Sequence, residues 1–98
     1  MKSFNELINT GKPVVVDFFA DWCGPCKAMV PILNDVKATV KENAIIIKID
    51  VDKAQALASE YGIRAIPTLL IFKDGKEVWR HSGVCPPEEL KKKIMSLV

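Results

Sequence analysis

Apolar residues gather in two short and nearly unbroken runs in the first half of the chain. Residues 14–20 read VVVDFFA, and residues 44–51 read AIIIKIDV. Runs of this length, rich in β-branched and aromatic side chains, are typical of strands that are buried on both faces of a parallel sheet. The pattern therefore predicts two buried parallel strands, with residues 14–20 at the centre of the sheet.

A helical pattern connects these two runs. Four apolar residues recur between them at helical spacing: Met29, Leu33, Val36 and Val40. They predict a long helix over about residues 23–41. Pro31 removes one internal hydrogen bond of that helix, so we expect a kink there.

Two shorter helices are predicted from their end signals. Ser3 and Glu6 have the capping-box spacing, which predicts a short helix that ends near Gly11. Asp52 is expected to cap a second helix that ends at Tyr61, directly before a glycine.

The second half of the chain predicts a hairpin and a final helix. Residues 68–73 and 76–82 have strand composition and flank Asp74-Gly75, a strong signal for a tight hairpin turn. Residues 86–97 begin with prolines and acids and continue with lysines, the charge order that suits a helix dipole. The whole pattern predicts an α/β fold with a mixed four-stranded sheet, in which active groups collect beyond the carboxyl ends of the parallel strands.

Composition narrows the class of protein. A chain of 98 residues with 49% hydrophobic residues predicts one domain, residues 1–98. Its formal charge of +2, without a basic block, argues against a nucleic-acid partner. We find neither a signal-peptide pattern nor an apolar run near the roughly 18 residues of a membrane span, so we expect a cytoplasmic protein without a membrane partner.

The cysteines give the first chemical clue. The chain has three, and the stretch WCGPC holds a close pair, Cys23 and Cys26, where the central strand passes to a helix N-terminus. Unpaired amides and the helix dipole favour a thiolate there. The dipole alone supplies only roughly 0.3–1 kcal/mol, whereas lowering the pKa of a thiol by one unit takes about 1.36 kcal/mol. Hydrogen bonds to the sulfur are expected to add the rest. Gly24 permits a tight entry, and Pro25 suits the first helical turn.

Several segments together resemble the thioredoxin family. The motif WCGPCK, the strand VVVDFFAD before it and the stretch YGIRAIPTLLIFKDGK after it carry the resemblance over almost the whole chain. Protein disulfide isomerases usually carry histidine in the central dipeptide and glutaredoxins Pro-Tyr, so Gly-Pro favours a reductant. The resemblance implies a thioredoxin fold, reduction of protein disulfides, recharging by a thioredoxin reductase, and no bound cofactor or metal.

The resemblance also implies roles for individual residues. Cys23 matches the family's exposed nucleophile, and Cys26 matches the resolving thiol. Asp17, inside the apolar strand, matches the buried aspartate that exchanges protons with the second cysteine, and burial is expected to raise its pKa. Lys48 matches the lysine beside that carboxylate.

A substrate-binding surface is implied around the cysteine pair. The Ile66-Pro67 bond resembles the family's cis peptide, beside which an extended substrate segment pairs with backbone. The residues expected to contact substrate are Trp22, Gly24, Pro25, Ile66, Pro67, Gly83 and Val84.

Other readings of these residues stay open. Cys23, Cys26, His81 and Cys85 together would supply a Cys3His set for zinc, although the second pair lacks a typical spacing. A redox-inert binding module would use the same apolar surface. Asp17 has the alternative interpretation of a satisfied core acid. His81, alone on an antiparallel strand, is interpreted as a solvated surface residue.

Two departures from the family pattern concern Cys85 and the N-terminus. Cys85 stands where the family often has an apolar residue, so we interpret it as a core filler, with a regulatory thiol as the alternative. Only Met1 and Lys2 precede the Ser3 cap, so the family's first strand is expected to be missing or vestigial. Residues 44–51 would then form a sheet edge guarded by charges, and the protein would be a monomer.

Overall fold

Helices and strands alternate along the computed structural model, which describes residues 3–98. The elements are α1 (Phe4–Ile8), β1 (Val14–Phe19), α2 (Gly24–Val40), a short 3-10 helix η1 (Lys41–Asn43), β2 (Ile45–Asp50), α3 (Gln55–Glu60), β3 (Thr68–Lys73), β4 (Lys76–Ser82) and α4 (Pro87–Met95). The predicted α/β class with four α-helices and a mixed four-stranded sheet is confirmed.

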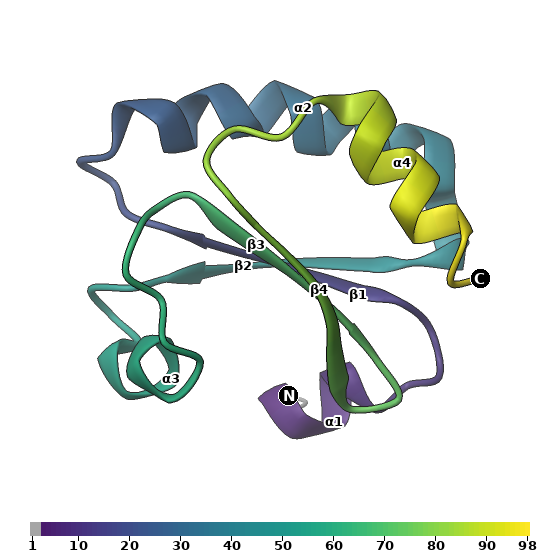
Figure 1. The fold of residues 1–98 in the computed structure, drawn as a ribbon, viewed down its shortest axis with the longest axis horizontal. Helices are drawn as coiled ribbons and strands as arrows, with labels where there is room; N and C mark the ends of the chain where they lie inside the picture. The colour runs from purple at the N-terminus through teal and green to yellow at the C-terminus, as the bar shows by residue number, and fades with distance from the viewer. Residues whose placement is uncertain (1–2) are drawn as a thin grey trace.

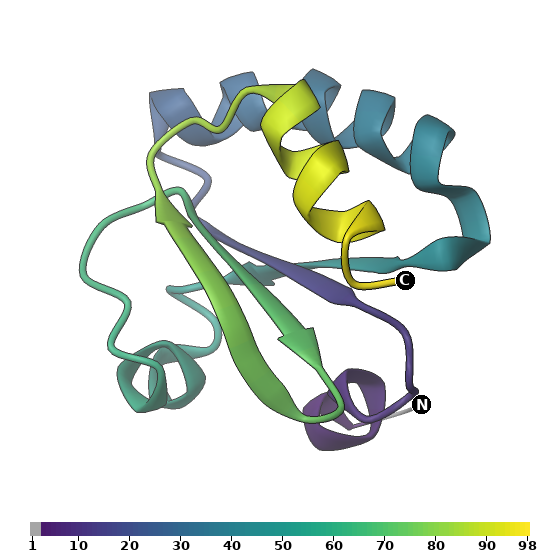
Figure 2. The same ribbon diagram turned by 45° about the vertical axis from the view of Figure 1, so that its right-hand side comes forward.

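The sheet has the strand order β2-β1-β3-β4. β1 pairs in parallel with β2 and antiparallel with β3, and β3 pairs antiparallel with β4. Helices α2 and α4 cover one face of the sheet, and α1 and α3 lie against the other (Figure 1). The turned view shows the same layers, with the β3–β4 hairpin in front (Figure 2).

β1 is buried because it is an inner strand with helices on both faces. Val15 packs in one core with Met29 of α2 and Leu90 of α4, whereas Val16 packs in a second core with Ile8 of α1. Since side chains of a strand alternate between faces, odd-numbered residues of β1 face α2 and α4. This alternation accounts for the unbroken apolar run, and it also points Asp17 toward the α2 side.

β2 differs from its prediction as a buried strand. Its apolar residues are only half-buried, and Lys48 is exposed. The reason is its place at the edge of the sheet, since β1 is its one strand neighbour within residues 3–98. The expectation of a sheet edge over residues 44–51 agrees with this strand order. The expectation that the family's first strand is missing falls on Met1 and Lys2, which lie outside the described residues.

The helix ends agree with the sequence signals in one case and not in another. At α1, the Glu6 amide donates to the Ser3 hydroxyl at 3.2 Å and the Ser3 amide to the Glu6 carboxylate at 3.3 Å, so the capping box is confirmed. The prediction that Asp52 caps α3 is wrong, because that helix begins after Ala54 and has no side-chain cap. Asp52 instead lies in the turn after β2.

The long helix α2 begins directly after Cys23 and continues through Pro31 to Val40. The kink expected at Pro31 stays a prediction. No helix among residues 3–98 combines the length and the apolar character that a membrane span needs.

The β3–β4 turn confirms the predicted hairpin. Asp74 and Gly75 both have positive φ, 53° and 82°, as two-residue hairpin turns require. The Gly75 amide donates to the Ile8 carbonyl at 3.0 Å, which joins the turn to the end of α1. A Cβ on Gly75 would overlap the side-chain oxygen of Asn9, whereas a Cβ on Gly11, at a φ of 86°, would meet no atom within 4 Å.

We predict that Gly75→Ala lowers the free energy of unfolding by about 2 kcal/mol and Gly11→Ala by about 1 kcal/mol. Both substitutions strain a left-handed backbone, but only the first displaces the Asn9 side chain, whose Nδ2 donates to the Asn5 carbonyl at 2.7 Å. Chemical denaturation of both variants measures the difference. Equal losses would show that the contact with Asn9 has no weight in docking the turn.

Candidate active site

The cysteine pair lies where β1 ends and α2 begins, as predicted. Cys23 is the N-cap of α2, and the Cys26 amide donates to the Cys23 sulfur at 3.1 Å. The two residues form a disulfide, with 5.3 Å between their Cα atoms. The Cys23 amide donates to the Ala20 carbonyl at 3.2 Å, which fixes the approach to the helix.

The expected exposure of Cys23 is not found in this disulfide state. Cys23 and Cys26 are each only 4% exposed, and they pack with Ala20 against half-buried Phe19 and Ile66. The position in the helix distinguishes the two sulfurs instead, because Cys23 alone caps the first turn and accepts its amide. When the pair is reduced, that amide and the helix dipole favour a thiolate on Cys23.

The Ile66-Pro67 peptide is cis, and it lies beside the disulfide. The Ile66 carbonyl oxygen is 3.8 Å from the Cys23 sulfur. The Pro67 carbonyl accepts the Gly83 amide at 2.8 Å, so the loop after β4 is held against the same peptide. Segments that are far apart in sequence thus meet at Cys23.

The side chains predicted to contact substrate differ in exposure. Trp22 is 71% exposed and Val84 42%, and the two residues between the cysteines, Gly24 and Pro25, are exposed as well. Ile66 and Gly83 are half-buried, whereas Pro67 is buried. The first four therefore form an accessible surface, and the buried Pro67 side chain is not part of it.

Asp52 belongs to this surface, although the sequence pattern did not predict it. The indole nitrogen of Trp22 donates to the Asp52 carboxylate at 2.8 Å. Asp52 reaches Trp22 because β1 and β2 are parallel and end together, with the Val51 amide donating to the Phe19 carbonyl at 2.9 Å. The signal that could have found it is its place two residues after the end of β2, which is equally typical of a helix cap.

Asp17 is fully buried, and neither of its carboxylate oxygens has a hydrogen-bond partner. Desolvation raises the pKa of Asp17 to about 6, and the positive charge of Lys48 opposes this rise. Lys48 is the register partner of Asp17 on β2. A carboxyl group with this pKa exists in both protonation states near neutral pH.

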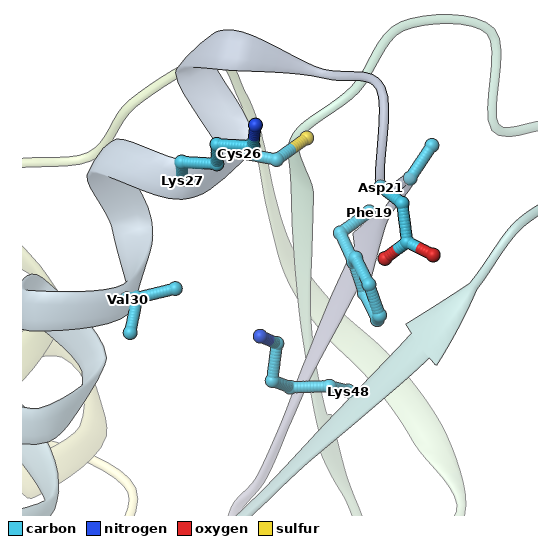
Figure 3. Close-up of a pocket in the computed structure, with 7 residues that line it drawn as sticks. Phe19, Asp21, Cys26, Lys27, Val30 and Lys48 are labelled. Carbon is cyan, nitrogen blue, oxygen red and sulfur yellow. The ribbon is translucent and has the colours of Figure 1, made fainter.

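A cavity of about 170 Å³ connects the second cysteine to the strands. Cys26 and Val30 of α2 line one side of it, and Phe19 and Lys48 line the other (Figure 3). The Lys48 ammonium group lies 4.5 Å from the centre of the Phe19 ring. The cavity has room for water molecules between Cys26 and the strand pair that carries Asp17. Asp21 and Lys27 also line the cavity and add charged groups to it. No pattern in the sequence indicates that these two residues lie there.

The alternative zinc set is not assembled. Cys23 and Cys26 are bonded to each other, and within residues 3–98 His81 and Cys85 group with Glu89 instead. Cys85 is fully buried, which agrees with a core filler, and desolvation together with the charge of Glu89 raises the pKa of its thiol to about 11. His81 is half-buried rather than solvated, since its ring stacks on Trp79.

Comparisons with known proteins agree on one family. The family model described as Thioredoxin matches residues 1–96. The chain is 50% identical to Thioredoxin Y2, chloroplastic, of Arabidopsis thaliana over 94% of its own length and 56% of that relative. It is 48% identical to a thioredoxin of Mycoplasmoides gallisepticum, over 89% of the chain and 86% of the relative.

A solved structure of similar shape is that of a mutant thioredoxin from Halobacterium salinarum NRC-1. It superposes with a TM-score of 0.85 at 40% identity, over 95% of this chain and 80% of that one. The chain spans a little over half the length of three chloroplastic relatives from Arabidopsis thaliana and Oryza sativa, at 56%, 54% and 56%.

We predict that Asp17→Asn stabilises the protein in a pH-dependent manner. The pKa of Asp17 is about 6 in the folded state against an ordinary 3.8, so between these values the folded state binds the proton more tightly. The contribution of Asp17 to stability is therefore best below about pH 4 and is lost as pH rises through about 6, a change of about 3 kcal/mol. Asn carries no charge, so this loss should disappear.

Chemical denaturation of the oxidised protein at pH 4 and pH 7 measures the effect. Asp17→Asn should exceed the parent by about 1–3 kcal/mol at pH 7 and by much less at pH 4. Asp21→Asn, which removes one negative charge from an exposed side chain of the same cavity, is the matched control. Parent and Asp17→Asn curves that run parallel across this range would show that Asp17 is not ionised at a cost in the folded state.

Proposed function

The chain belongs to the thioredoxin family, and from this premise we propose that it reduces disulfide bonds in other proteins by reversible opening of the Cys23–Cys26 disulfide. The observation that carries the proposal is the redox pair at the N-terminus of α2, directly beside the cis Ile66-Pro67 peptide. The chain would act as a protein-disulfide reductase, with residues 1–98 working as one domain.

Reduction proceeds in two thiol-disulfide exchanges. The Cys23 thiolate attacks one sulfur of the target disulfide, forms a mixed disulfide and releases the other target sulfur as a thiolate. Cys26 then loses its proton and attacks the Cys23 sulfur, which releases the second target thiol and closes the Cys23–Cys26 disulfide. The target gains two electrons and two protons, and Cys23 and Cys26 lose the same number. The amide of Cys26 supports the first step, since it already donates to the Cys23 sulfur.

Asp17 takes the proton that Cys26 must lose, through water in the cavity that Cys26 and Lys48 line. A general base works best when its pKa lies near the working pH, and burial raises the pKa of Asp17 to about 6. The positive charge of Lys48 opposes this rise. Its role is therefore to keep the pKa of Asp17 from rising further. Support for this step comes from the burial of Asp17 and from the shared position of Lys48 beside both the carboxylate and the cavity.

Targets dock on the surface around Cys23. Trp22 and Val84 supply exposed apolar area, and Gly24 and Pro25 leave the approach to the sulfur uncrowded. The backbone of Ile66, next to buried Pro67 and to Gly83, offers hydrogen bonds to an extended segment of the target. This surface suits an apolar peptide around a disulfide better than a charged ligand.

The proposed partners follow from this chemistry. Disulfide-containing proteins are the substrates, and a thioredoxin reductase restores the dithiol, so the chain needs no bound cofactor, nucleic acid or membrane of its own. We propose that the protein works in the cytoplasm, where reducing conditions keep such a cysteine pair in the dithiol form. The names of three relatives assign those proteins to chloroplasts. Equilibration with glutathione tests the reducing role, because an isomerase would settle at a more oxidising potential.

We predict that Cys23 and Cys26 carry out different steps of the reaction. Cys23→Ser should abolish reduction of a protein disulfide, since no thiolate attacks. Cys26→Ser should leave the attack intact and accumulate a mixed disulfide, which mass spectrometry detects as a covalent adduct that dithiothreitol releases. Cys85→Ala is the control that keeps both reacting thiols. A Cys26→Ser protein that traps no target would overturn the assignment of Cys23 as nucleophile and Cys26 as resolving thiol. A wild-type protein that reduces no protein disulfide would support the alternative of a redox-inert binding module.

We also predict a monomer with a guarded edge at β2. Lys48 projects a charge from the middle of this strand, and Lys41, Glu42, Asp50 and Asp52 lie at its two ends. Charged side chains discourage pairing of a second chain with an open edge. Sedimentation at rising concentration under reducing conditions should show a constant monomer mass.

A proline variant identifies the edge if a dimer appears. The Ile45 and Val51 amides donate toward β1, to the carbonyls of Pro13 and Phe19, each at 2.9 Å, so the intervening even-numbered amides point outward. Ile46→Pro therefore removes an outward amide without breaking the ladder to β1. A concentration-dependent dimer that Ile46→Pro abolishes, with the monomer still folded, would show that the charges fail as a guard.

A further inference from the structure

Three side chains of different chemistry meet between β4 and α4, apart from the proposed redox pair. One ring nitrogen of His81, the sulfur of Cys85 and one carboxylate oxygen of Glu89 all lie within 4.8 Å of one another. Within residues 3–98 this is the group of histidine, cysteine and acidic side chains that comes close enough to hold a metal ion. We propose that His81, Cys85 and Glu89 form a binding site for a zinc ion.

The hydrogen bond of His81 leaves one ring nitrogen free for a metal. Its Nε2 lies 3.3 Å from the Val84 carbonyl, which can only accept, so Nε2 carries the proton in this contact. The lone pair then lies on Nδ1. Histidine ligands of metals usually donate their other ring N–H to a carbonyl or carboxylate, which fixes the tautomer and the ring orientation. The His81 ring is held further by stacking on Trp79, with 5.7 Å between ring centroids and 12° between planes.

The donor set selects zinc among common divalent ions. Thiolate sulfur, imidazole nitrogen and carboxylate oxygen together suit Zn²⁺, whereas calcium and magnesium prefer oxygen alone. Bond lengths of about 2.0–2.3 Å in a tetrahedron place ligand atoms about 3.5 Å apart. The present spacing therefore needs to close by about 1 Å, which the exposed and flexible Glu89 side chain allows. Three protein ligands leave the fourth position to a water molecule.

Binding is a simple exchange of a proton for the metal. The Cys85 thiol releases its proton to solvent and its sulfur binds Zn²⁺ as a thiolate, while neutral His81 and ionised Glu89 bind without losing a proton. No oxidation or reduction occurs. Cys85 is fully buried, His81 half-buried and Glu89 exposed, so the ion enters from the Glu89 side.

The charges around the site favour a cation. Lys91 of α4 contacts Asp35 and Glu88, each at 3.0 Å, and Lys92 and Lys93, three and four residues after Glu89, make no ion pair with it among the salt bridges of residues 3–98. Glu89 makes no ion pair among the salt bridges of residues 3–98, so its charge is left to a cation from solution. His81 and Cys85 flank the loop that carries Gly83 and Val84, and a bound ion would clamp that loop from both sides.

The oxidised protein gives the cleanest test, because the Cys23–Cys26 disulfide leaves Cys85 as the one free thiol of residues 3–98. Co²⁺ replaces Zn²⁺ as a spectroscopic probe, and we expect one equivalent to give a thiolate-to-cobalt charge-transfer band together with tetrahedral visible bands. The protein should also withdraw one zinc ion per chain from a chromophoric chelator. Trp79 fluorescence should change with the same stoichiometry.

Matched variants assign the ligands. His81→Gln and Glu89→Gln should each weaken zinc binding by about tenfold or more, and Cys85→Ala should remove the charge-transfer band. Glu88→Gln removes the same charge from the neighbouring residue of the α4 first turn and should bind zinc like the parent. This control measures any general effect of charge on the helix dipole.

The proposal fails if the oxidised protein withdraws no zinc, or if Glu88→Gln and Glu89→Gln weaken binding equally. It also fails if binding appears only after reduction and Cys23→Ser abolishes it, since the redox pair would then be the ligand. Because neither half-buried His81 nor exposed Glu89 belongs to the buried core, His81→Gln and Glu89→Gln leave the core intact, and the test holds even if Cys85→Ala does not fold. Disulfide reduction measured in the presence of a chelator reports separately on the proposed function.

Discussion

The position of β1 between β2 and β3, with helices on both faces, is the constraint on which the rest of the structure depends. Every side chain of this strand must be buried from its first residue to the fifth. The strand also ends at the N-terminus of α2, so the chain leaves the core directly into a helix cap. The same burial that stabilises the sheet therefore brings Cys23 to the N-cap of α2, where its sulfur accepts the Cys26 amide, and fixes Asp17 on the side of the sheet that α2 covers.

Asp17 shows what this constraint costs. A carboxylate without a hydrogen-bond partner at a fully buried position opposes folding, and the opposing term rises when the group ionises. Two features make it tolerable. Lys48 lies beside it in register on the edge strand, where the ammonium group stays exposed to water, and the raised pKa leaves the group partly protonated near neutrality. An inner strand next to an edge strand thus lets a core acid interact with a solvated cation.

The sequence predicted those parts of the fold that depend on local patterns. The β1 run, the capping box of Ser3 and Glu6, and the Asp74-Gly75 turn each carry their signal within a few residues, and each is found as expected. The burial predicted for β2 is wrong because composition does not reveal how many neighbours a strand has. The cap predicted at Asp52 is wrong because α3 begins after Ala54, and the contact that Asp52 makes instead, with the indole of Trp22, depends on the parallel pairing of β1 and β2. The grouping of His81 with Glu89 likewise depends on the angle between β4 and α4, which no local pattern encodes.

The three cysteines show how position alone divides one kind of side chain into different chemistries. Cys23 accepts an amide hydrogen bond at a helix N-terminus, and that contact favours the charged form of a thiol. Cys85 lies in the core beneath α2 and α4, where desolvation raises its pKa to about 11. Burial therefore keeps the Cys85 thiol protonated at neutral pH, and the side chain has no exposed surface. The proposed exchange with a target disulfide needs a thiolate within reach, so Cys85 would not compete with the Cys23–Cys26 pair. A third cysteine is therefore compatible with a single redox centre in this fold.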